Sequence, residues 1–319
     1  MTQIRSSHTA ARRRPGVLGV HSLDHFSLTV PDLEQARVFY AAFGLQARPR
    51  GNTLELYTEG HPQCWAVLTE GKRKQLHHLS FGAYADDLDL FRARLDRMGI
   101  ERIDPPGGTA SNGIWFRDCD GTPIEIKAAE KSSPDAKSQL DLTPSPASTR
   151  NAPMRGTTAP VRPRRLAHTL LFARDVPRST KFYTEVLGLG LSDGAADVVA
   201  FLHGVHGSDH HMVAFVKSEA PGYHHSSWDM RSIHDIGQGA MDMAGQGYTR
   251  GWGLGRHVLG SNYFHYVQDP WGSFAEYSGD IDYMPVDGEW QAQMHSPDNS
   301  FYLWGPNPPD YFTVNTEAA

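Results

Sequence analysis

Residues 23–45, LDHFSLTVPDLEQARVFYAAFGL, return in the second half of the chain as residues 166–189, LAHTLLFARDVPRSTKFYTEVLGL. His25 and His168 are 143 positions apart, and most of the matching residues keep that offset. Each copy begins with alternating apolar and polar residues, as a half-buried strand does, and continues with apolar residues at helical spacing. Each copy therefore predicts a strand followed by an amphipathic helix that packs on a sheet.

Two further pairs of segments match in the same order. Residues 76–81, LHHLSF, match residues 223–228, YHHSSW, at an offset of 147. Residues 118–125, DCDGTPIE, match residues 269–276, DPWGSFAE, at an offset of 151. Offsets that grow slowly along the chain indicate small loop insertions in a duplicated domain. The sequence therefore predicts an α+β protein of two tandem domains, each with a strand, a helix and several further strands.

The chain outside these segments differs in composition. Residues 130–163 contain six prolines, many Ser and Thr and no aromatic residue, which predicts a linker without a core. The segment after residue 283 is rich in Trp, Tyr, Phe and Pro, and so much aromatic area is expected to pack on a surface. We therefore expect a flexible tail at 1–20, a first domain at 21–129, the linker at 130–163, a second domain at 164–283 and a tail at 284–319 that packs on the second domain.

Composition excludes several classes of protein. The chain of 319 residues carries a formal net charge of -6, which argues against a nucleic-acid binder that relies on phosphate neutralisation. No stretch approaches the roughly 18 apolar residues of a membrane helix, so no membrane partner is expected. Cys64 and Cys119 are far apart and form no CxxC pair. They predict neither a disulfide scaffold nor a zinc ribbon, and they fit the reducing cytoplasm as the location.

Histidine, the commonest metal ligand, occurs 17 times, with 11 of the residues after position 165. In the second repeat, His168 lies on the first expected strand, His225 on a later strand and Glu276 on the last. Two imidazoles and a carboxylate on one face of a metal ion leave its other positions open, as in non-haem Fe(II) oxygenases. Because strand neighbours point to opposite faces, we expect only one histidine of the 224/225 pair to line this site, with His224 structural or at the surface.

At these residues the sequence resembles a known family. The repeats look like the paired βαβββ modules of the vicinal oxygen chelate superfamily, over about residues 23–128 and 166–283. The second half also resembles the type I extradiol ring-cleavage dioxygenases, which open catechols beside the two hydroxyls. This closer resemblance is carried by residues 166–189, 209–215, 223–228 and 255–277. It implies two tandem domains of this fold, with the metal site in the C-terminal barrel.

The resemblance assigns metal binding to His168, His225 and Glu276, with Fe(II) as the ion or, less often, Mn(II). It implies a catecholic substrate, O2 as the second substrate and a homo-oligomeric protein. The family acts on monocyclic catechols, biphenyl diols, naphthalene diols and trihydroxylated rings, and residues 263–283 are similar to a branch that acts on trihydroxytoluene-like rings. Four aromatic residues are candidates for the pocket wall, and the sequence does not show which way they face: Phe215, Trp228, Tyr248 and Trp271.

Three further residues match catalytic positions of the family. His211 falls on the histidine that hydrogen-bonds dioxygen and transfers a proton. His257 falls on the histidine that stabilises an oxygen of the substrate or of a later intermediate. Tyr266 falls on the tyrosine that hydrogen-bonds the ionised catechol oxygen. The spacing of nine residues between His257 and Tyr266 is that of the family.

The first repeat is ambiguous. It keeps His25, His78 and Glu125 at the positions of the three metal ligands, but it lacks the three groups expected to act beside the metal. The positions that match those groups are near Gln63, Pro106 and Trp115. We therefore interpret the first repeat as a vestigial site in a structural domain.

Two other functions fit the same superfamily. A glyoxalase-like lyase or isomerase with Zn or Ni draws four ligands from two modules, and it has no evident need for His211, His257 and Tyr266 together. A binding protein that sequesters a small molecule, such as an antibiotic, needs a cleft and no metal. The dioxygenase hypothesis accounts for all six polar residues, whereas the alternatives leave some of them without a role.

Overall fold

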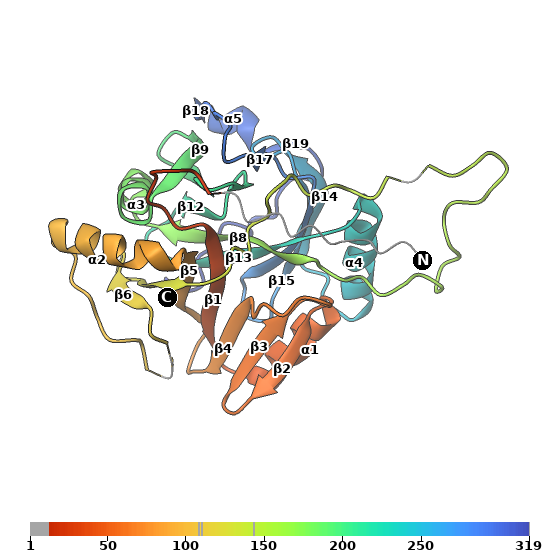
Figure 1. Ribbon diagram of the computed structural model, residues 1–319. Coiled ribbons are helices and arrows are strands. Elements are labelled where there is room, and N and C mark those ends of the chain that lie inside the picture. The colour runs from red at the N-terminus through yellow and green to blue at the C-terminus, as the bar shows by residue number, and fades with distance from the viewer. Residues whose placement is uncertain (1–12, 108, 110, 143, 319) are drawn as a thin grey trace, which may run out of the picture.

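The computed structural model describes residues 13–107, 109, 111–142 and 144–318. Its strands form a seven-stranded sheet from the first half of the chain, a ten-stranded sheet from the second half and a small two-stranded sheet (Figure 1). Among these residues, no helix is long and apolar enough to cross a membrane.

The first half contains two modules that share one sheet. Their elements are β1 (Ser22–Val30), α1 (Leu33–Ala42), β2 (Gln46–Arg50), β3 (Thr53–Tyr57) and β4 (Ala66–Glu70), then β5 (Gln75–Ala83), η1 (Ala85–Asp87), α2 (Leu88–Arg97), β6 (Ile114–Arg117) and β7 (Pro123–Ala128). The strand order is β2-β3-β4-β1-β5-β7-β6. The helix α1 begins where the Asp32 side chain accepts a hydrogen bond from the Gln35 amide, and it ends before Gly44, whose φ of +103° strains any other residue.

The second half repeats this plan and adds strands at both edges. Its elements are β8 (Arg165–Ala173), α3 (Val176–Phe182), η2 (Tyr183–Leu187), β9 (Leu189–Ala195), β10 (Val199–Gly204), β11 (Ser208–Asp209), β12 (Val213–Lys217), β13 (Gly222–Asp229), α4 (Ile233–Gly245), β14 (Gly251–His257), β15 (Tyr263–Gln268), β16 (Phe274–Gly279), β17 (Tyr283–Met284), β18 (Gln293–His295), α5 (Pro297–Ser300) and β19 (Tyr302–Trp304). The large sheet has the order β18-β9-β10-β12-β8-β13-β16-β15-β14-β19.

The two halves share one pairing scheme. In the first half β1 pairs in parallel with β4 and antiparallel with β5, and β5 pairs in parallel with β7. The strands β8, β12, β13 and β16 repeat these pairings in the second half. The predicted α+β fold of repeated modules is therefore confirmed. One detail differs, because the counterpart of β14 in the first half is a single bridge at Arg102.

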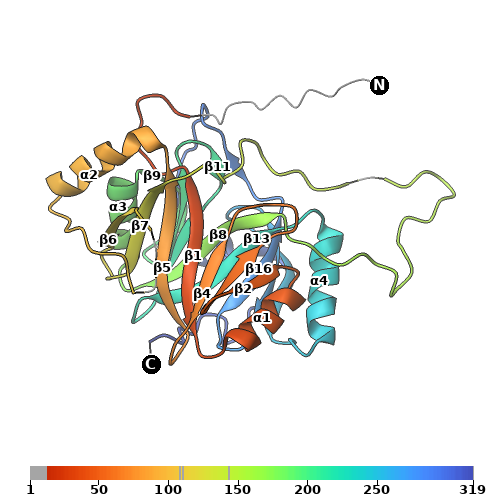
Figure 2. The ribbon, with the colours of Figure 1, turned by 60° about the horizontal axis from the view of Figure 1, so that its bottom comes forward.

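The two halves pack tightly against each other. The rings of Phe43 and Tyr277 stack at a centroid distance of 3.9 Å, and the Tyr277 hydroxyl donates to the Phe43 carbonyl oxygen. Phe26 stacks on Tyr223 in the same way at 5.4 Å. Figures 1 and 2 show α1 beside α4 and α2 beside α3 across this contact. Buried residues of both halves consequently form one continuous apolar core.

The start of the chain and the linker have different surroundings. Residues 13–20, expected to belong to a flexible tail, are anchored: Arg13 forms ion pairs with Asp86 and Asp87, and the Val20 amide donates to the Leu187 carbonyl oxygen. The rest of that expected tail, residues 1–12, lies outside the described residues. The described parts of 130–163 form no helix or strand, and Figure 1 shows the middle of this segment running far out from the body.

The C-terminal segment crosses the second half from one sheet edge to the other. Its strand β18 pairs with β9, and β19 pairs with β14 at the opposite edge. Phe312 then packs among Trp252, Phe264 and Tyr266. Farther along, Glu317 forms an ion pair with the buried Lys74 of the first half at 2.7 Å. This segment therefore contacts both halves.

His21 gives the fold a measurable dependence on acid. Its buried ring donates a hydrogen bond to the Ala129 carbonyl oxygen, and burial lowers its pKa to about 4. At His21 the unfolded chain binds a proton below about pH 6.5, whereas the folded chain binds it only below about pH 4. The stability that the neutral, buried ring contributes is therefore lost as the pH falls from 6.5 towards 4. Between pH 7 and pH 5 the free energy of unfolding of the wild type should fall by roughly 1–2 kcal/mol more than that of His21→Gln in urea titrations. Equal falls would contradict this assignment.

Candidate metal centre and active site

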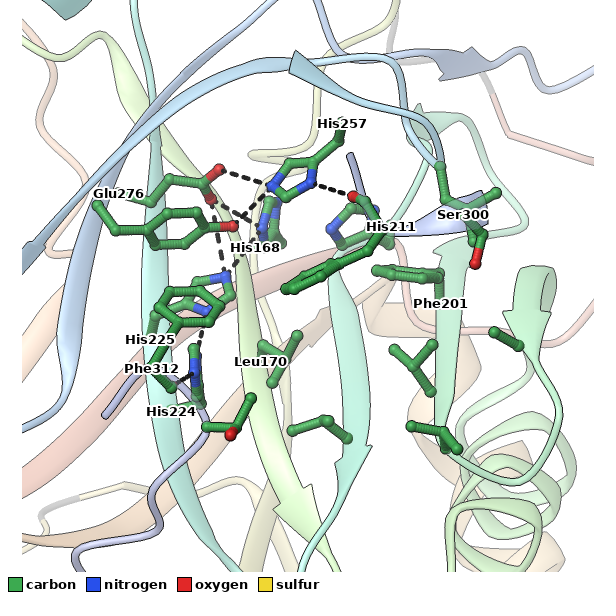
Figure 3. A pocket seen from close by; sticks show the side chains of 18 of the residues that line it. His168, Leu170, Phe201, His211, His224, His225, His257, Glu276, Ser300 and Phe312 are labelled. Carbon is green, nitrogen blue, oxygen red and sulfur yellow. Dashed lines mark hydrogen bonds and ion pairs between the residues drawn. The ribbon is translucent and has the colours of Figure 1, made fainter. Parts of the chain in front are cut away.

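Three strands of the second half bring His168, His225 and Glu276 together. In the register of the sheet, His168 of β8 is opposite Ser227 of β13, and Ser227 is opposite Glu276 of β16. The two histidine Nε2 atoms are 3.4 Å apart, and Glu276 Oε2 lies 3.3 Å from Nε2 of His168 and 3.7 Å from that of His225 (Figure 3). Among the described residues, this is the group of three whose ligand atoms all lie within 4.8 Å of one another.

A β-bulge changes the expected facing of His224. The register of β13 against β8 shifts between Tyr223 and His225, which leaves His224 as an extra residue. The expectation that only one histidine of the pair lines the site was wrong, because strict alternation breaks at this bulge. Both histidines line the cavity, and His224 is 3% exposed.

His224 fixes the proton position on His225. Its Nε2–H donates to the Phe312 carbonyl oxygen over 2.7 Å, and burial lowers the pKa of its ring to about 4, so the ring is neutral. The Nδ1 of a neutral ring with this tautomer can only accept. The 2.7 Å contact between the two Nδ1 atoms is therefore donated by His225. The Nε2 lone pair of His225 is left to face His168 and Glu276, as a metal ligand requires.

The charges and unpaired atoms of this group fit a bound cation. Glu276 is fully buried, and its Oε2, which faces Nε2 of both histidines, has no hydrogen-bond partner. Burial raises the pKa of Glu276, but its contacts with His168, His257 and Ser227 hold that pKa below the usual value, so the carboxylate is ionised. A buried anion without a matching positive charge is unfavourable. A divalent metal on the two imidazoles and the carboxylate would remove this cost.

His211 lies beside this group, just before β12. Its ring centroid is 3.9 Å from that of His168. Nδ1 of His211 is 3.0 Å from Nδ1 of His210, whose Nε2–H donates to Asp193 over 2.9 Å. When His210 is neutral, His211 donates from Nδ1 and keeps its Nε2 lone pair for the cavity. Burial, and then the neighbouring histidines, lower the pKa of His211 well below its usual value.

His257 and Tyr266 form a hydrogen-bonded pair on the opposite side. His257 Nδ1–H donates to the Phe301 carbonyl oxygen over 2.8 Å, and burial lowers the pKa of this histidine. Its Nε2 therefore accepts from the Tyr266 hydroxyl, at 2.9 Å. Burial and the nearby Glu276 raise the pKa of Tyr266 well above its usual value, so the phenol keeps its proton. All six residues named from the sequence thus line one cavity.

The cavity has a volume of about 220 Å³ and is apolar away from these groups. Leu170 and Phe201 form part of the wall (Figure 3), and Phe301 and Phe312 of the C-terminal segment form another part. None of the four aromatic candidates from the sequence lines the cavity. They lie in the continuous core or pack against it: Phe215, Trp228, Tyr248 and Trp271.

Several residues that shape the site escaped the sequence analysis. Asp193 and His210 orient His211, and Asn262 donates to Glu276 over 3.2 Å. The repeated His-His pairs were a usable signal, since both the expected proton carrier and the ligand at 225 follow another histidine. No pattern in the sequence marks Phe301 and Phe312 as cavity walls, because their segment has no counterpart in the first half.

Comparison with known proteins places the chain in a family. Residues 22–126 and 165–277 match the Glyoxalase/Bleomycin resistance protein/Dioxygenase superfamily, to which the chain belongs. Within it, the chain is a type I extradiol ring-cleavage dioxygenase. It is 48% identical to metapyrocatechase 2 of Cupriavidus necator over 314 residues, covering 98% of this chain and 97% of that protein.

Solved structures share the fold at lower identity. A variant of homoprotocatechuate 2,3-dioxygenase from Brevibacterium fuscum matches with a TM-score of 0.73 and 21% identity, over 96% of this chain and 84% of the other. The Mn(II)-bound glyoxalase from Novosphingobium aromaticivorans matches with a TM-score of 0.72 and 23% identity, over 95% of this chain and all of the other. The same fold thus occurs in enzymes of both kinds.

Proposed function

We propose that this protein cleaves a single-ring catechol with O2 at an Fe(II) ion bound by His168, His225 and Glu276. The observation that carries the proposal is the convergence of these ligands at one end of an apolar cavity, beside three further polar groups. The relationship to metapyrocatechase 2 supports the catechol class. Two neutral imidazoles and one carboxylate leave a divalent ion with one positive charge, which favours an anionic, chelating substrate.

The metal supplies a Lewis acid that lowers the pKa of a bound hydroxyl and holds both substrates at one centre. The chain supplies positioned proton carriers. Tyr266 is a protonated donor that can turn from His257 to an ionised catechol oxygen. His257, fixed by the Phe301 carbonyl, then presents Nε2 to the same edge of the ring. His211 lies on the other side, where its free Nε2 accepts and returns a proton.

The size of the cavity favours one ring over two. A cavity of about 150 Å³ lined by apolar side chains holds benzene, and this cavity measures about 220 Å³. One substituted ring fits that space, with its apolar body between Phe201 and Phe312 and its hydroxyls towards the ligands. We therefore propose catechol and small alkyl or hydroxyl derivatives, including trihydroxytoluenes, ahead of biphenyl diols.

Oxygen uptake tests the proposal directly. The protein is loaded with Fe(II) without air and offered catechol, 3-methylcatechol, a trihydroxytoluene and 2,3-dihydroxybiphenyl in turn. We expect one O2 consumed per ring opened, an absorbing ring-fission product, and a lower kcat/KM for the biphenyl. Parallel loading with Mn(II) identifies the ion that gives higher turnover. Bound iron with no uptake for any ring would contradict the proposal.

Tyr266→Phe tests the assignment of the substrate hydrogen bond. A hydrogen bond to a charged group contributes about 1.5–3 kcal/mol, so we expect kcat/KM for catechol to fall by about 10–100-fold. The iron content should not change, because the hydroxyl is not one of the three ligating groups. Oxygen-electrode kinetics with iron analysis measures both quantities. Unchanged kcat/KM, or a loss of iron, would remove this role from Tyr266.

A further inference from the structure

The first half of the chain carries a second cluster of metal-ligating side chains that the proposed reaction does not use. His25, His78 and Glu125 line an open pocket of about 940 Å³ on the seven-stranded sheet. We propose that this pocket binds a second divalent transition-metal ion through Nε2 of His25 and Nε2 of His78, with Glu125 as the third ligand.

The backbone of the first half places these residues as the second half places its own ligands. His25 of β1 is opposite Ser80 of β5, and Ser80 is opposite Glu125 of β7. The corresponding register in the second half joins His168, Ser227 and Glu276. The three chain positions are therefore equivalent in the two sheets. Among the described residues, only the group in the second half has all three ligand atoms within 4.8 Å of one another, so Glu125 would have to turn towards the two imidazoles to bind the ion.

The imidazole pair has the geometry of the pair in the candidate metal centre. Nε2 of His25 and Nε2 of His78 are 3.2 Å apart, and the rings are 5.3 Å apart at 85°. For His168 and His225 the values are 3.4 Å, 5.4 Å and 73°. Two ring nitrogens of different strands thus converge on one point in each half. Imidazole pairs with a carboxylate suit Zn, Co, Ni and Fe.

The surroundings of the pair prepare both rings to bind a cation. Nδ1–H of His25 donates to the Asp24 carboxylate over 2.7 Å, which leaves the lone pair on Nε2. This carboxylate–histidine arrangement is the usual support of a metal-ligating histidine. His78 is buried, and its Nδ1 lies 2.8 Å from Nδ1 of His77, so its Nε2 is the nitrogen that faces His25. β-Bulges lie at Asp24 and His77, as they do at Ala167 and His224 in the other half.

Two serines donate hydrogen bonds to the Glu125 carboxylate. Its Oε2 accepts from Ser80 over 2.5 Å, and its Oε1 accepts from Ser111. Coordination would exchange one of these hydrogen bonds for the metal. Acidic side chains outnumber basic ones in the pocket wall, which attracts a cation. The ionisable groups concerned are Asp24, Glu55, Glu125 and Glu130 against Arg50 and Lys127.

The second ion would not support ring cleavage. Trp115 lies 5.0 Å from the ring of His78, as Tyr266 lies 5.1 Å from that of His225, so an indole replaces the phenol. The pocket is also larger and more open to solvent than the apolar cavity. We therefore expect an exchangeable ion that is bound more weakly than the ion in the second half.

Metal counting on the full chain tests the proposal. The protein, with its stronger site filled by Fe(II), is dialysed without air against Zn(II) and analysed for both metals. We expect one further Zn(II) per wild-type chain and none in the His25→Ala, His78→Ala double variant, with turnover per iron unchanged. Asp24→Asn should weaken Zn(II) binding by about 10–100-fold in calorimetry. His61→Ala, which changes an exposed histidine of the same half, should behave as wild type.

Two results would overturn the proposal. One is a wild-type chain that takes up no second ion at millimolar Zn(II). The other is a second ion that remains in the double variant. A crystal of the wild type soaked in Zn(II) gives an independent check if the variants fold poorly, because the anomalous peak must lie between the rings of His25 and His78. These readouts are metal counts and positions, so they are separate from any failure of the ring-cleavage assay.

Discussion

His225→Ala is expected to lose its iron and its oxygen uptake together, with turnover falling on the order of 1000-fold or more, because metal catalysis supplies several kcal/mol. The variant keeps Glu276 and His168 but removes the lone pair that His224 and Phe312 orient towards them. Only two of the three ligating groups then remain, so the ion is expected to dissociate. Iron analysis after anaerobic loading, followed by oxygen-electrode assays with catechol, measures both losses.

His234→Ala is the matched control for this experiment. His234 is an exposed histidine of the same half, on α4, and has no contact with the cavity. Iron content and turnover should equal those of the wild type. A His225→Ala protein that retains a full equivalent of iron would show that this histidine is not a ligand. Catechol cleavage at the wild-type rate would reject the whole metal centre.

His211→Asn is expected to separate metal binding from chemistry. Its ring contacts the proposed ligand His168 but is not one of the three ligating groups, so a full equivalent of iron should remain. A positioned proton carrier contributes typically 10²–10⁴-fold, and kcat should fall by about this amount while KM for catechol changes little. Single-turnover kinetics with anaerobically loaded protein distinguish a slow chemical step from slow product release.

Asp193→Asn is expected to lower kcat less than His211→Asn does. Asp193 accepts from His210, and His210 in turn contacts His211. An asparagine can present its amide to His210 and leave the proton on the wrong nitrogen, so a smaller fall in kcat with normal iron is expected. Unaltered kcat in His211→Asn would remove that residue from the mechanism, whatever the result for Asp193→Asn.

The fold could be predicted from the sequence because the chain contains two copies of the same pattern, and each copy supports the interpretation of the other. The motif around His25 recurs around His168, and two copies with the same order of segments leave little freedom in strand order. The three expected metal ligands could also be predicted, since they lie on strands whose register the repeat fixes. His211, His257 and Tyr266 have no counterparts in the first repeat and were assigned from the family resemblance. His224 was misjudged for a local reason. The bulge there adds one residue, and a hydrophobic pattern does not show where alternation breaks.

The apolar wall of the cavity could not be predicted from the sequence in the same way. Trp228 and Phe215 are large aromatic residues close to the metal ligands in sequence, but they point into the core shared by the two halves. Phe301 and Phe312 reach the cavity through long-range packing of a segment with no repeat partner. The start of the chain shows the same limit. Residues 13–20 look like a tail because their partners, such as Asp86, lie far away in sequence.

The carbonyl that orients the His224 ring belongs to Phe312, 88 residues further along the chain. During synthesis, a chain that has reached β16 already contains every metal ligand, but the tautomer of His225 is still undetermined and one wall of the cavity is missing. We expect the C-terminal segment to complete the site when it docks, because it orients His224 and closes that wall. We therefore expect a chain stopped before Phe312 to bind the ion more weakly than the full chain.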